Sequence, residues 1–352
     1  MSKETKTATL SEGRVAKIIQ VHPSLQCNLF CKHCYSSSAP SYKEGLAVGP
    51  ILRILEEGRS LGYNVVSLSG GEPFLYRSLE TLLTESRSMG YFNSVTTNGM
   101  LLKSATARRI LQQLDLIAFS IDGKEPEHDN LRGLDGAYQK MLEGVEVAKE
   151  YVSKFGFIHT VQPQSWTIFP WLAKLAIEKG AALLHLHPLE LAGRAGEYFH
   201  DLKFGNEDLH KTYITHYYLQ SYFAEELYIQ LDLLHKDHIE DNPSFCFHAQ
   251  GDVCQLNDFS SLFRELIIDE KGDILPIAHG CSPYFRLGNI EERLPLADMI
   301  SRFMQYRFTE LMDVYKATYD EIVNDPEKEI FNWSELVLHQ TQQYSQVLVE
   351  NE

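Results

Sequence analysis

The sequence reads VAKIIQVH over residues 15–22 and continues as PSLQCNLFCKHCY to residue 35. The first segment is rich in β-branched residues and predicts a strand. The second carries Cys27, Cys31 and Cys34 in the spacing C-x3-C-x2-C. A strand that delivers the chain into a short loop with three cysteines is therefore the first unit of the expected fold.

Downstream of this unit, strand and helix periods alternate about six times, with Gly, Pro, Asn or Asp at the joints. The expected strands cover residues 15–22, 65–69, 93–97, 116–121, 157–161 and 182–187. The expected helices cover residues 50–62, 79–89, 103–114, 137–151 and 166–179. This order predicts parallel βαβ crossovers. Six units are fewer than the eight of a closed barrel, so the expected fold class is α/β, a partial (β/α)6 TIM-like barrel, with a doubly wound open sheet as the alternative.

After about residue 190 the alternation ends. A Tyr-rich amphipathic helix is expected over residues 206–226, and a hairpin over 262–276 with its turn at Glu270 to Asp273. Two further helices are expected over 296–314 and 333–349. The predicted organisation is an N-terminal tail over 1–14, the partial barrel over 15–195, and a smaller α+β cap with a helical tail over 196–352.

Charge and cysteine usage limit the class of protein. The 352 residues include 32 Lys and Arg against 48 Asp and Glu, a formal net charge of −16. The electrostatic field of so negative a chain repels phosphate groups, which disfavours nucleic acid and anionic membranes as partners. The N-terminus has no apolar signal region and the chain has no apolar run of 18 residues. We therefore expect a cytoplasmic protein whose six cysteines are reduced.

The three clustered cysteines predict a metal site. Three thiolates can bind three irons of a [4Fe–4S] cluster and leave the fourth iron open. Structural zinc, with His33 or His22 as the fourth ligand, is the alternative. The C-x3-C-x2-C spacing resembles that of the radical S-adenosylmethionine (SAM) superfamily, and the resemblance extends over about residues 15–190. It implies a [4Fe–4S] cluster on these cysteines and SAM as the second cofactor.

Further segments carry the same resemblance. Residues 69–73, SGGEP, resemble the motif that lies against the methionine end of SAM, and TTNG at 96–99 and SIDG at 120–123 resemble segments near its ribose and adenine. HDNLRG at 128–133 resembles a segment whose Arg contacts the SAM carboxylate. The SAM-binding residues implied are Tyr35, Gly70, Gly71, Glu72, Asn98, Ser120, Asp122 and Arg132. The alternatives are ordinary turn and capping residues and, for Arg132, a surface salt bridge.

Histidines and downstream cysteines leave two questions open. His185 and His187 point to one face of a strand and are either ligand contacts or core residues, and His159 is a weaker candidate.

The hairpin at 269–276 and the LGNI segment at 287–290 resemble the SPASM or twitch extension of peptide-modifying members. Its usual hairpin cysteine is replaced by Ile277. Either Cys246, Cys254 and Cys281 form an auxiliary cluster, or the extension is a metal-free cap.

The resemblance implies an enzyme that reductively cleaves SAM and abstracts hydrogen from its substrate, expected to be a peptide or protein undergoing modification. A small-molecule enzyme of cofactor, tetrapyrrole or antibiotic synthesis is the alternative. An alternative of another class is a zinc or redox-cluster interaction module. An electron donor such as flavodoxin or ferredoxin is implied as a partner. Because 26 residues precede Cys27, a leader peptide is expected to bind elsewhere, and no catalytic acid or base is assigned.

Overall fold

The computed structural model describes residues 15–243 and 259–350, with side chains as far as residue 346. Its main sheet has ten strands in the order β11-β10-β9-β1-β2-β3-β4-β5-β6-β7. The strands of this sheet are β1 (Ile18–Val21), β2 (Val65–Leu68), β3 (Phe92–Thr97), β4 (Leu116–Ser120), β5 (Phe155–Val161), β6 (Leu183–Pro188), β7 (Tyr228–Leu231), β9 (Glu265–Ile268), β10 (Asp273–Leu275) and β11 (Gly288–Asn289). Two short strands, β8 (Leu234–His235) and β12 (Ile330–Phe331), form a separate antiparallel pair.

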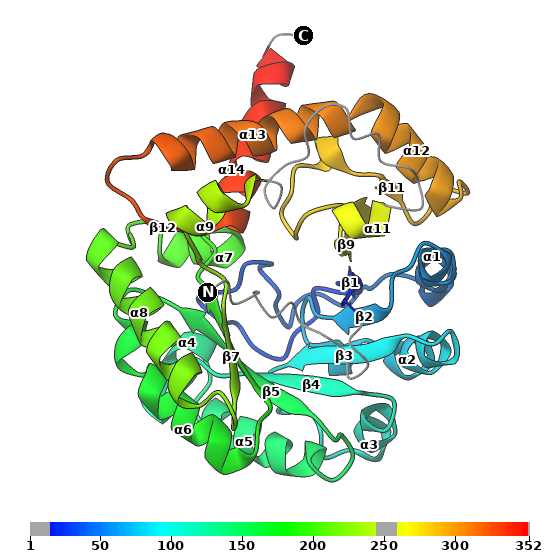
Figure 1. Cartoon of the computed structure of the whole chain (residues 1–352). Helices are drawn as coiled ribbons and strands as arrows, with labels where there is room; N and C mark the ends of the chain where they lie inside the picture. The colour runs from blue at the N-terminus through cyan, green and yellow to red at the C-terminus, as the bar shows by residue number, and fades with distance from the viewer. Residues whose placement is uncertain (1–14, 244–258, 351–352) are drawn as a thin grey trace.

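Helices surround the outside of this sheet, which curves around its inner face without closing (Figure 1). The longer ones are α1 (Val48–Ser60), α2 (Leu79–Ser88), α3 (Ala105–Leu111), α4 (Glu125–Arg132), α5 (Ala137–Ala148), α6 (Phe169–Lys179), α8 (Asn206–Tyr222), α12 (Leu296–Tyr306), α13 (Phe308–Asn324) and α14 (Trp333–Glu350). Short helices are α7 (Gly193–Tyr198), α9 (Lys236–Asp241) and α11 (Phe259–Leu262). The predicted α/β class is confirmed as an open, partial-barrel sheet, and the six predicted strands correspond to β1–β6.

The sheet extends beyond these six strands at both edges. β7 pairs in parallel with β6, and β9 pairs in parallel with β1. β10 then folds back antiparallel to β9, as the predicted hairpin requires, with Gly272 at a φ of +82° in its turn. Segments that follow the barrel in sequence therefore complete the same sheet in space.

Two helices differ from the expected pattern. α4 forms over residues for which the sequence predicted no element, with Pro126 in its first turn and Gly133 in a left-handed conformation at its end. Its sequence is too polar to show an apolar period. The helix expected over 296–314 is two helices, because Arg307 has a φ of −131° and interrupts the regular backbone between α12 and α13.

The two faces of the sheet have different chemistry. Ile19 and Val21 are fully buried on the outer face, beneath the helices. Gln20 between them lies on the inner face, because successive strand residues point to opposite faces. His185 and His187 of β6 alternate in the same way with the fully buried Leu184 and Leu186. The inner face therefore carries polar groups and suits a ligand better than a packed core.

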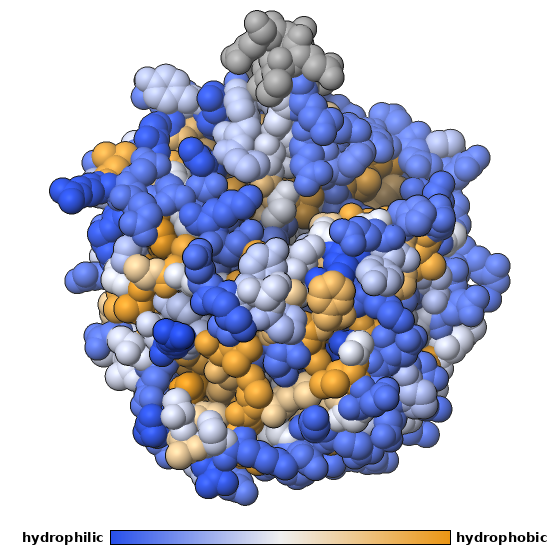
Figure 2. Space-filling view, turned by 180° about the vertical axis from the view of Figure 1, so that it is seen from behind, coloured by the Kyte–Doolittle hydropathy of each residue, from blue (hydrophilic) through white to orange (hydrophobic). Residues whose placement is uncertain are grey.

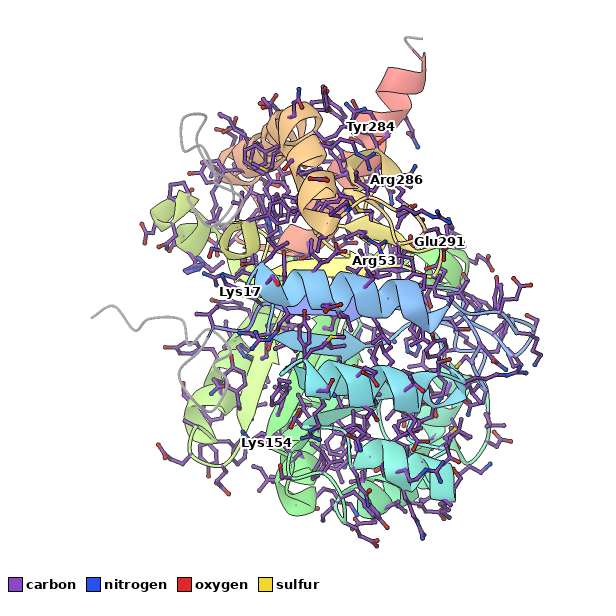
Figure 3. The ribbon with its side chains drawn as sticks, turned by 90° about the vertical axis from the view of Figure 1, so that its right-hand side faces the viewer. Lys17, Arg53, Lys154, Tyr284, Arg286 and Glu291 are labelled. Atoms are coloured by element: carbon purple, nitrogen blue, oxygen red, sulfur yellow. The ribbon has the colours of Figure 1, made fainter. Side chains whose placement is uncertain are left out.

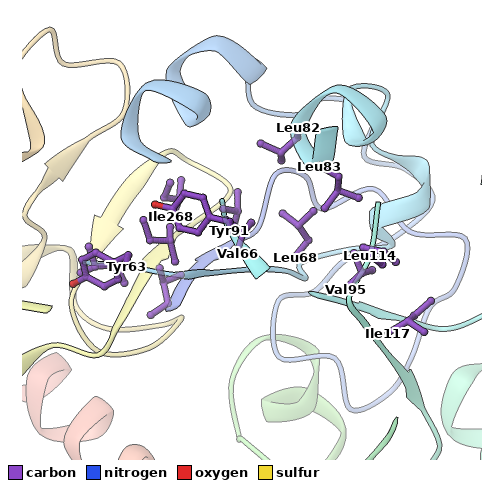
Figure 4. Close-up of a cluster of buried hydrophobic side chains, with 14 of the residues drawn as sticks. Tyr63, Val66, Leu68, Leu82, Leu83, Tyr91, Val95, Leu114, Ile117 and Ile268 are labelled. Atoms are coloured by element: carbon purple, nitrogen blue, oxygen red, sulfur yellow. The ribbon is translucent and has the colours of Figure 1, made fainter. Parts of the chain in front are cut away.

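The C-terminal strands share the hydrophobic core of the barrel. Ile268 of β9 lies in the same cluster as Tyr63, Val66 and Tyr91 (Figure 4). The hydroxyl of Tyr63 also donates a hydrogen bond to the carbonyl oxygen of Phe263, at 2.8 Å. The core is thus continuous between the first strands and the strands near residue 265.

Arg53 attaches α1 to the C-terminal segment. Its Nη2 donates to the carbonyl oxygens of Ile290 and Glu292, both at 2.8 Å, and its Nη1 donates to that of Leu294 at 3.1 Å. Figure 3 shows Arg53 on the side of α1 turned toward these elements. The face seen from behind the view of Figure 1 is mostly hydrophilic, with apolar side chains gathered in its lower half (Figure 2). Within the described ranges, no helix combines the length and apolar character needed to cross a bilayer.

Candidate active site

A cavity of about 180 Å³ lies at the carboxyl ends of the parallel strands, where α/β sheets usually bind ligands. It brings together residues from the cysteine loop and from each segment that resembles a SAM-binding motif. Its lining consists of Cys27, Cys31, His33, Cys34, Tyr35, Ser38, Ser69, Gly70, Gly71, Glu72, Thr96, Thr97, Asn98, Ser120, Arg132, Ile158, Thr160, His187, Pro188 and Glu190.

The three cysteines of the loop line one side of this cavity as free thiols. Burial, and to a lesser extent the neighbouring thiols, raises the pKa of Cys27 to about 12. Burial also raises the pKa of Cys31, although the Arg132 guanidinium lies 3.9 Å from its Sγ and opposes that shift. Thiolates at these positions therefore need a bound cation, which is the environment that a metal or an iron–sulfur cluster supplies.

Arg194 of α7 holds the cysteine loop in place, a role that was not predicted from the sequence. Its guanidinium donates to the carbonyl oxygens of Cys31 and Ser38, both at 2.7 Å, and of Ser37 at 3.3 Å. Its own backbone N–H donates to the carbonyl of Cys34, and its guanidinium stacks 3.7 Å from the Phe30 ring centroid. Because the partners are main-chain carbonyls about 160 residues away, no local pattern marks this contact.

Asp122 lies behind Arg132 and does not line the cavity. Its Oδ2 accepts from Nε of Arg132 at 2.7 Å and lies 2.6 Å from Nη2, while His33 Nε2 approaches it at 3.3 Å. Burial opposes ionisation, but the charges of Arg132 and His33 outweigh it and hold the pKa of Asp122 well below its usual range. The sequence predicted a direct ligand contact for Asp122, and the structure pairs it with Arg132.

Glu72 joins the second and third strand ends. Its Oε1 accepts from the Thr97 hydroxyl at 2.8 Å, and its Oε2 accepts from the N–H of Asn98 at 2.9 Å. The side chain is 3% exposed, and burial raises its pKa despite these hydrogen bonds. Glu72 therefore fixes the loop after β3 as well as lining the cavity.

The backbone of the SGGEP segment lies so close to that of the cysteine loop that its two glycine positions leave little room for a side chain. Gly70 has a φ of +100°, a conformation that favours glycine. A Cβ on Gly71 would lie 2.2 Å from the carbonyl oxygen of Gln26. The Nδ2 of Asn98 donates to Oδ1 of Asn28 at 2.8 Å and ties the third strand end to the same loop.

The two remaining predicted SAM-binding residues also lie at the cavity. The hydroxyl of Tyr35 is 3.4 Å from that of Ser69, and burial raises the pKa of Tyr35. Ser120 lines the cavity at the end of β4.

His187 and Glu190 line the cavity and belong to a cluster of titratable groups that extends away from it to His185 and Asp232. Oδ2 of Asp232 lies 2.5 Å from Nε2 of His185 and 2.7 Å from Nδ1 of His187. Nε2 of His187 lies 3.2 Å from Oε1 of Glu190. Burial lowers the pKa of His187, but the hydrogen bonds to Asp232 and Glu190 outweigh it and raise the pKa to about 10. The sequence singled out the two histidines but missed Asp232, which follows the unpredicted strand β7.

Two other candidate residues, His159 and Cys281, lie in the packed interior and do not line the cavity. His159 is buried, and its Nδ1 lies 2.9 Å from the carbonyl oxygen of Ile121. Cys281 is 3% exposed within the hydrophobic core. Cys246 and Cys254 lie outside the described residues, so an auxiliary cluster stays a prediction.

The two histidines considered as zinc ligands have other neighbours. Nε2 of His22 lies 2.9 Å from Nε2 of Gln20, and its ring stacks on that of His279 with centroids 4.6 Å apart. Nε2 of His33 faces Asp122. Among the described residues, Nε2 of each of these two histidines thus faces a side chain other than the three thiols.

Comparison with known proteins agrees with this geometry. Residues 21–174 match the family model described as Radical SAM superfamily. The chain is 30% identical over 190 residues to the pre-heme d1 synthase of Dinoroseobacter shibae, covering 53% of this chain and 47% of that protein. It is 35% identical over 157 residues to the GTP 3′,8-cyclase of Synechococcus sp., covering 42% and 45%. The chain thus spans about half the length of each of these curated relatives.

A solved structure extends the likeness of the fold beyond the barrel. The crystal structure of Streptococcus suis SuiB bound to S-adenosylmethionine aligns with a TM-score of 0.62 at 17% identity, covering 88% of this chain and 68% of that one. At this identity the match concerns the fold alone. It includes most of the C-terminal region, which is consistent with strands β9–β11 completing the sheet.

Proposed function

Because residues 21–174 form a radical SAM domain, we propose that this chain is an enzyme that cleaves SAM reductively and abstracts hydrogen from its substrate. The observation that carries the proposal is the single cavity that gathers Cys27, Cys31 and Cys34 with the ends of strands β2–β4. The spacing of the thiols suits three irons of a [4Fe–4S] cluster. When bound, the cluster and SAM together supply a 5′-deoxyadenosyl radical.

The residues around the cavity fit these two cofactors. The buried thiols need a cation, and Arg132, 3.9 Å from the Cys31 sulfur, adds positive charge beside them. Gly70 and Gly71 let the strand end pack against residues 24–26 and line the cavity beside the thiols. Nε and Nη2 of Arg132 are held by Asp122, so Arg132 would bind the SAM carboxylate through Nη1 in a charge-assisted hydrogen bond, with Asp122 as the residue that positions it. Tyr35, Glu72, Asn98 and Ser120 complete the proposed SAM contacts.

The C-terminal strands and α7 support this chemistry indirectly. Arg194 fixes the carbonyls of the cysteine loop, so the three thiols keep their directions. A cavity that is enclosed by the curved sheet limits the access of water to a reactive intermediate. The role of the chain is therefore to hold, orient and shield its cofactors.

Iron analysis tests the cluster assignment. We expect about four iron and four sulfide per chain after anaerobic reconstitution, in keeping with one [4Fe–4S] cluster. A chain in which Cys27, Cys31 and Cys34 are replaced by alanine should lose that iron. Iron retained by this variant would indicate a second cluster, and zinc in place of iron would overturn the proposal.

For the substrate, we favour a small polar molecule. The sequence favoured a peptide, but the curated relatives at 30% and 35% identity are named for heme d1 and GTP chemistry. The inner wall formed by His187, Glu190 and Thr160 offers hydrogen-bonding groups to such a ligand. A peptide is the second candidate, supported by the hairpin over 265–275 and by the fold shared with SuiB, which was also solved bound to precursor peptide SuiA.

Deuterium transfer separates the two candidates. A substrate deuterated at the reacting carbon should deliver its label to 5′-deoxyadenosine during turnover. Pools of deuterated small metabolites and of deuterated peptides can be tested side by side. Label arriving only from the peptide pool would refute the small-molecule proposal without affecting the radical SAM assignment.

A further inference from the structure

We propose that His185, His187 and Asp232 bind a divalent transition-metal ion at the edge of the cavity, where His187 contributes to its lining. The ligand atoms of these three residues lie within 4.8 Å of one another. Two imidazole nitrogens and one carboxylate oxygen are donors that suit iron(II), zinc and cobalt(II). This site is separate from the proposed iron–sulfur site and uses none of its ligands.

The fold places the three ligands by strand register. His185 and His187 occupy alternate positions of β6 and therefore share the inner face. His185 is opposite Gln230 of the neighbouring strand β7, and Asp232 follows that strand directly. The backbone N–H of Asp232 donates to the carbonyl oxygen of Leu186 at 3.2 Å, which fixes the carboxylate beside both rings.

Outer partners orient two of the ligands. The Nδ1 of His187 faces Asp232, while its Nε2 lies 3.2 Å from a carboxylate oxygen of Glu190. The free oxygen of Asp232, Oδ1, accepts from Nε2 of Gln230 at 2.9 Å. A metal-bound histidine usually donates its second N–H to a carboxylate, and the Glu190–His187 pair has this arrangement.

Charge also favours a dication at this point. Asp232 and Glu190 contribute two carboxylates beside the histidines, and the half-buried Glu265 of β9 adds a third carboxyl group that interacts electrostatically with Asp232 and His187. In the part of the chain that the structure describes, no lysine or arginine forms a salt bridge with Asp232, Glu190 or Glu265. Carboxylates gathered in this way are stabilised by a bound cation.

The proposed metal site is accessible to ions from solvent, and its three protein ligands do not fill the coordination sphere of the ion. The side chains of His185, Asp232 and His187 are 22%, 29% and 38% exposed, so an ion can enter through the cavity. Three protein ligands leave coordination positions open, as in catalytic rather than structural metal sites. We infer that the ion holds an oxygen or nitrogen donor of the substrate; this role rests on the proposed function, whereas metal binding itself does not.

Cobalt(II) is a suitable probe, because its X-ray absorption is distinct from that of cluster iron. The cluster-loaded full chain should bind one cobalt ion in anaerobic equilibrium dialysis. Asp232→Asn and His185→Gln should each weaken binding by at least about tenfold. His210→Gln is the matched control, since His210 pairs with Glu329 at the surface, and it should bind cobalt like the parent.

The cobalt absorption edge supplies a measurement that needs no variant. The fine structure above the cobalt edge should show two imidazole ligands and no sulfur ligand in the parent chain. Absence of bound cobalt, sulfur ligation, or unchanged affinity in both site variants would each overturn the proposed site and indicate a purely hydrogen-bonded cluster. None of these outcomes depends on SAM cleavage, so the result stands apart from a test of the enzymatic proposal.

Discussion

At the scale of single residues, the chemistry at the cavity depends on buried charges with identified partners. The sequence predicted the three cysteines and Arg132, because their types and spacing are visible locally. It did not predict Arg194 or Asp232, whose partners are far away in sequence. Nor did it predict that Asp122 lies behind Arg132, since a carboxylate after a strand has the same local pattern in either role.

The Asp122–Arg132 pair provides a test at this scale. Asp122→Asn keeps the shape of the side chain but leaves the Arg132 guanidinium buried without its counter-charge. Breaking a buried pair in this way costs about 3–5 kcal/mol, measurable as a lower free energy of unfolding in urea. Glu80→Gln, which breaks the exposed pair with Arg109, should leave stability nearly unchanged. Equal effects of the two variants would contradict this account.

His22 predicts a dependence of stability on pH. Burial lowers the pKa of His22 to about 3, with the nearby His279 contributing in the same direction. The unfolded chain, with the ordinary value of 6.5, therefore binds a proton that the folded chain excludes. Stability from this group is complete above pH 6.5 and is lost as the pH falls toward 3.

The loss should reach about 2 kcal/mol by pH 5. His22→Phe retains an aromatic ring against His279 and removes the titrating group. Urea unfolding of both proteins between pH 5 and pH 7 should show a smaller pH dependence in the variant. Parallel pH profiles would show that His22 is protonated equally well in the folded state.

At the scale of elements, the alternation of strands and helices was predictable because β1–β6 are short segments with apolar residues at buried positions, bounded by turn residues. α4 was not, since its eight residues are almost all polar and its boundaries are set by Pro126 and Gly133. β7 and β9 were also missed as strands of the main sheet. Their pairing partners are β6 and β1, and such long-range pairing is invisible in a local period.

The contact between the SGGEP segment and the cysteine loop can be tested with a methyl group. In Gly71→Ala the new Cβ would meet the carbonyl oxygen of Gln26 at 2.2 Å, so the two loops must separate. We expect lower iron content after reconstitution and a loss of stability of about 1–3 kcal/mol. Gly49→Ala in α1, where nothing lies within 4 Å of the added Cβ, should retain the iron and be neutral or slightly more stable.

At the scale of the whole molecule, the region after residue 195 is structurally joined to the barrel through strands β7 and β9 and through Arg53. The sequence predicted a smaller attached region, and periodicity could not show that it completes the sheet. Its hairpin was predictable from the turn around Gly272.

A core substitution in β9 tests this continuity. Ile268 is fully buried, and Ile268→Ala should lower the free energy of unfolding by about 2–5 kcal/mol. Because β9 packs with the core around Tyr63 and Tyr91, probes in the barrel and in the C-terminal helices should lose structure in one transition. Separate transitions, with the barrel unaffected by the substitution, would show that the two regions are independent.

The central claim is that the cysteine cavity generates radicals from SAM. The most direct measurement is the formation of 5′-deoxyadenosine when the anaerobically reconstituted chain is mixed with SAM and a strong reductant. We predict product from the parent chain and none from Cys31→Ala with its fold retained. A correctly reconstituted parent that forms no 5′-deoxyadenosine, or product that persists in Cys31→Ala, would contradict the account.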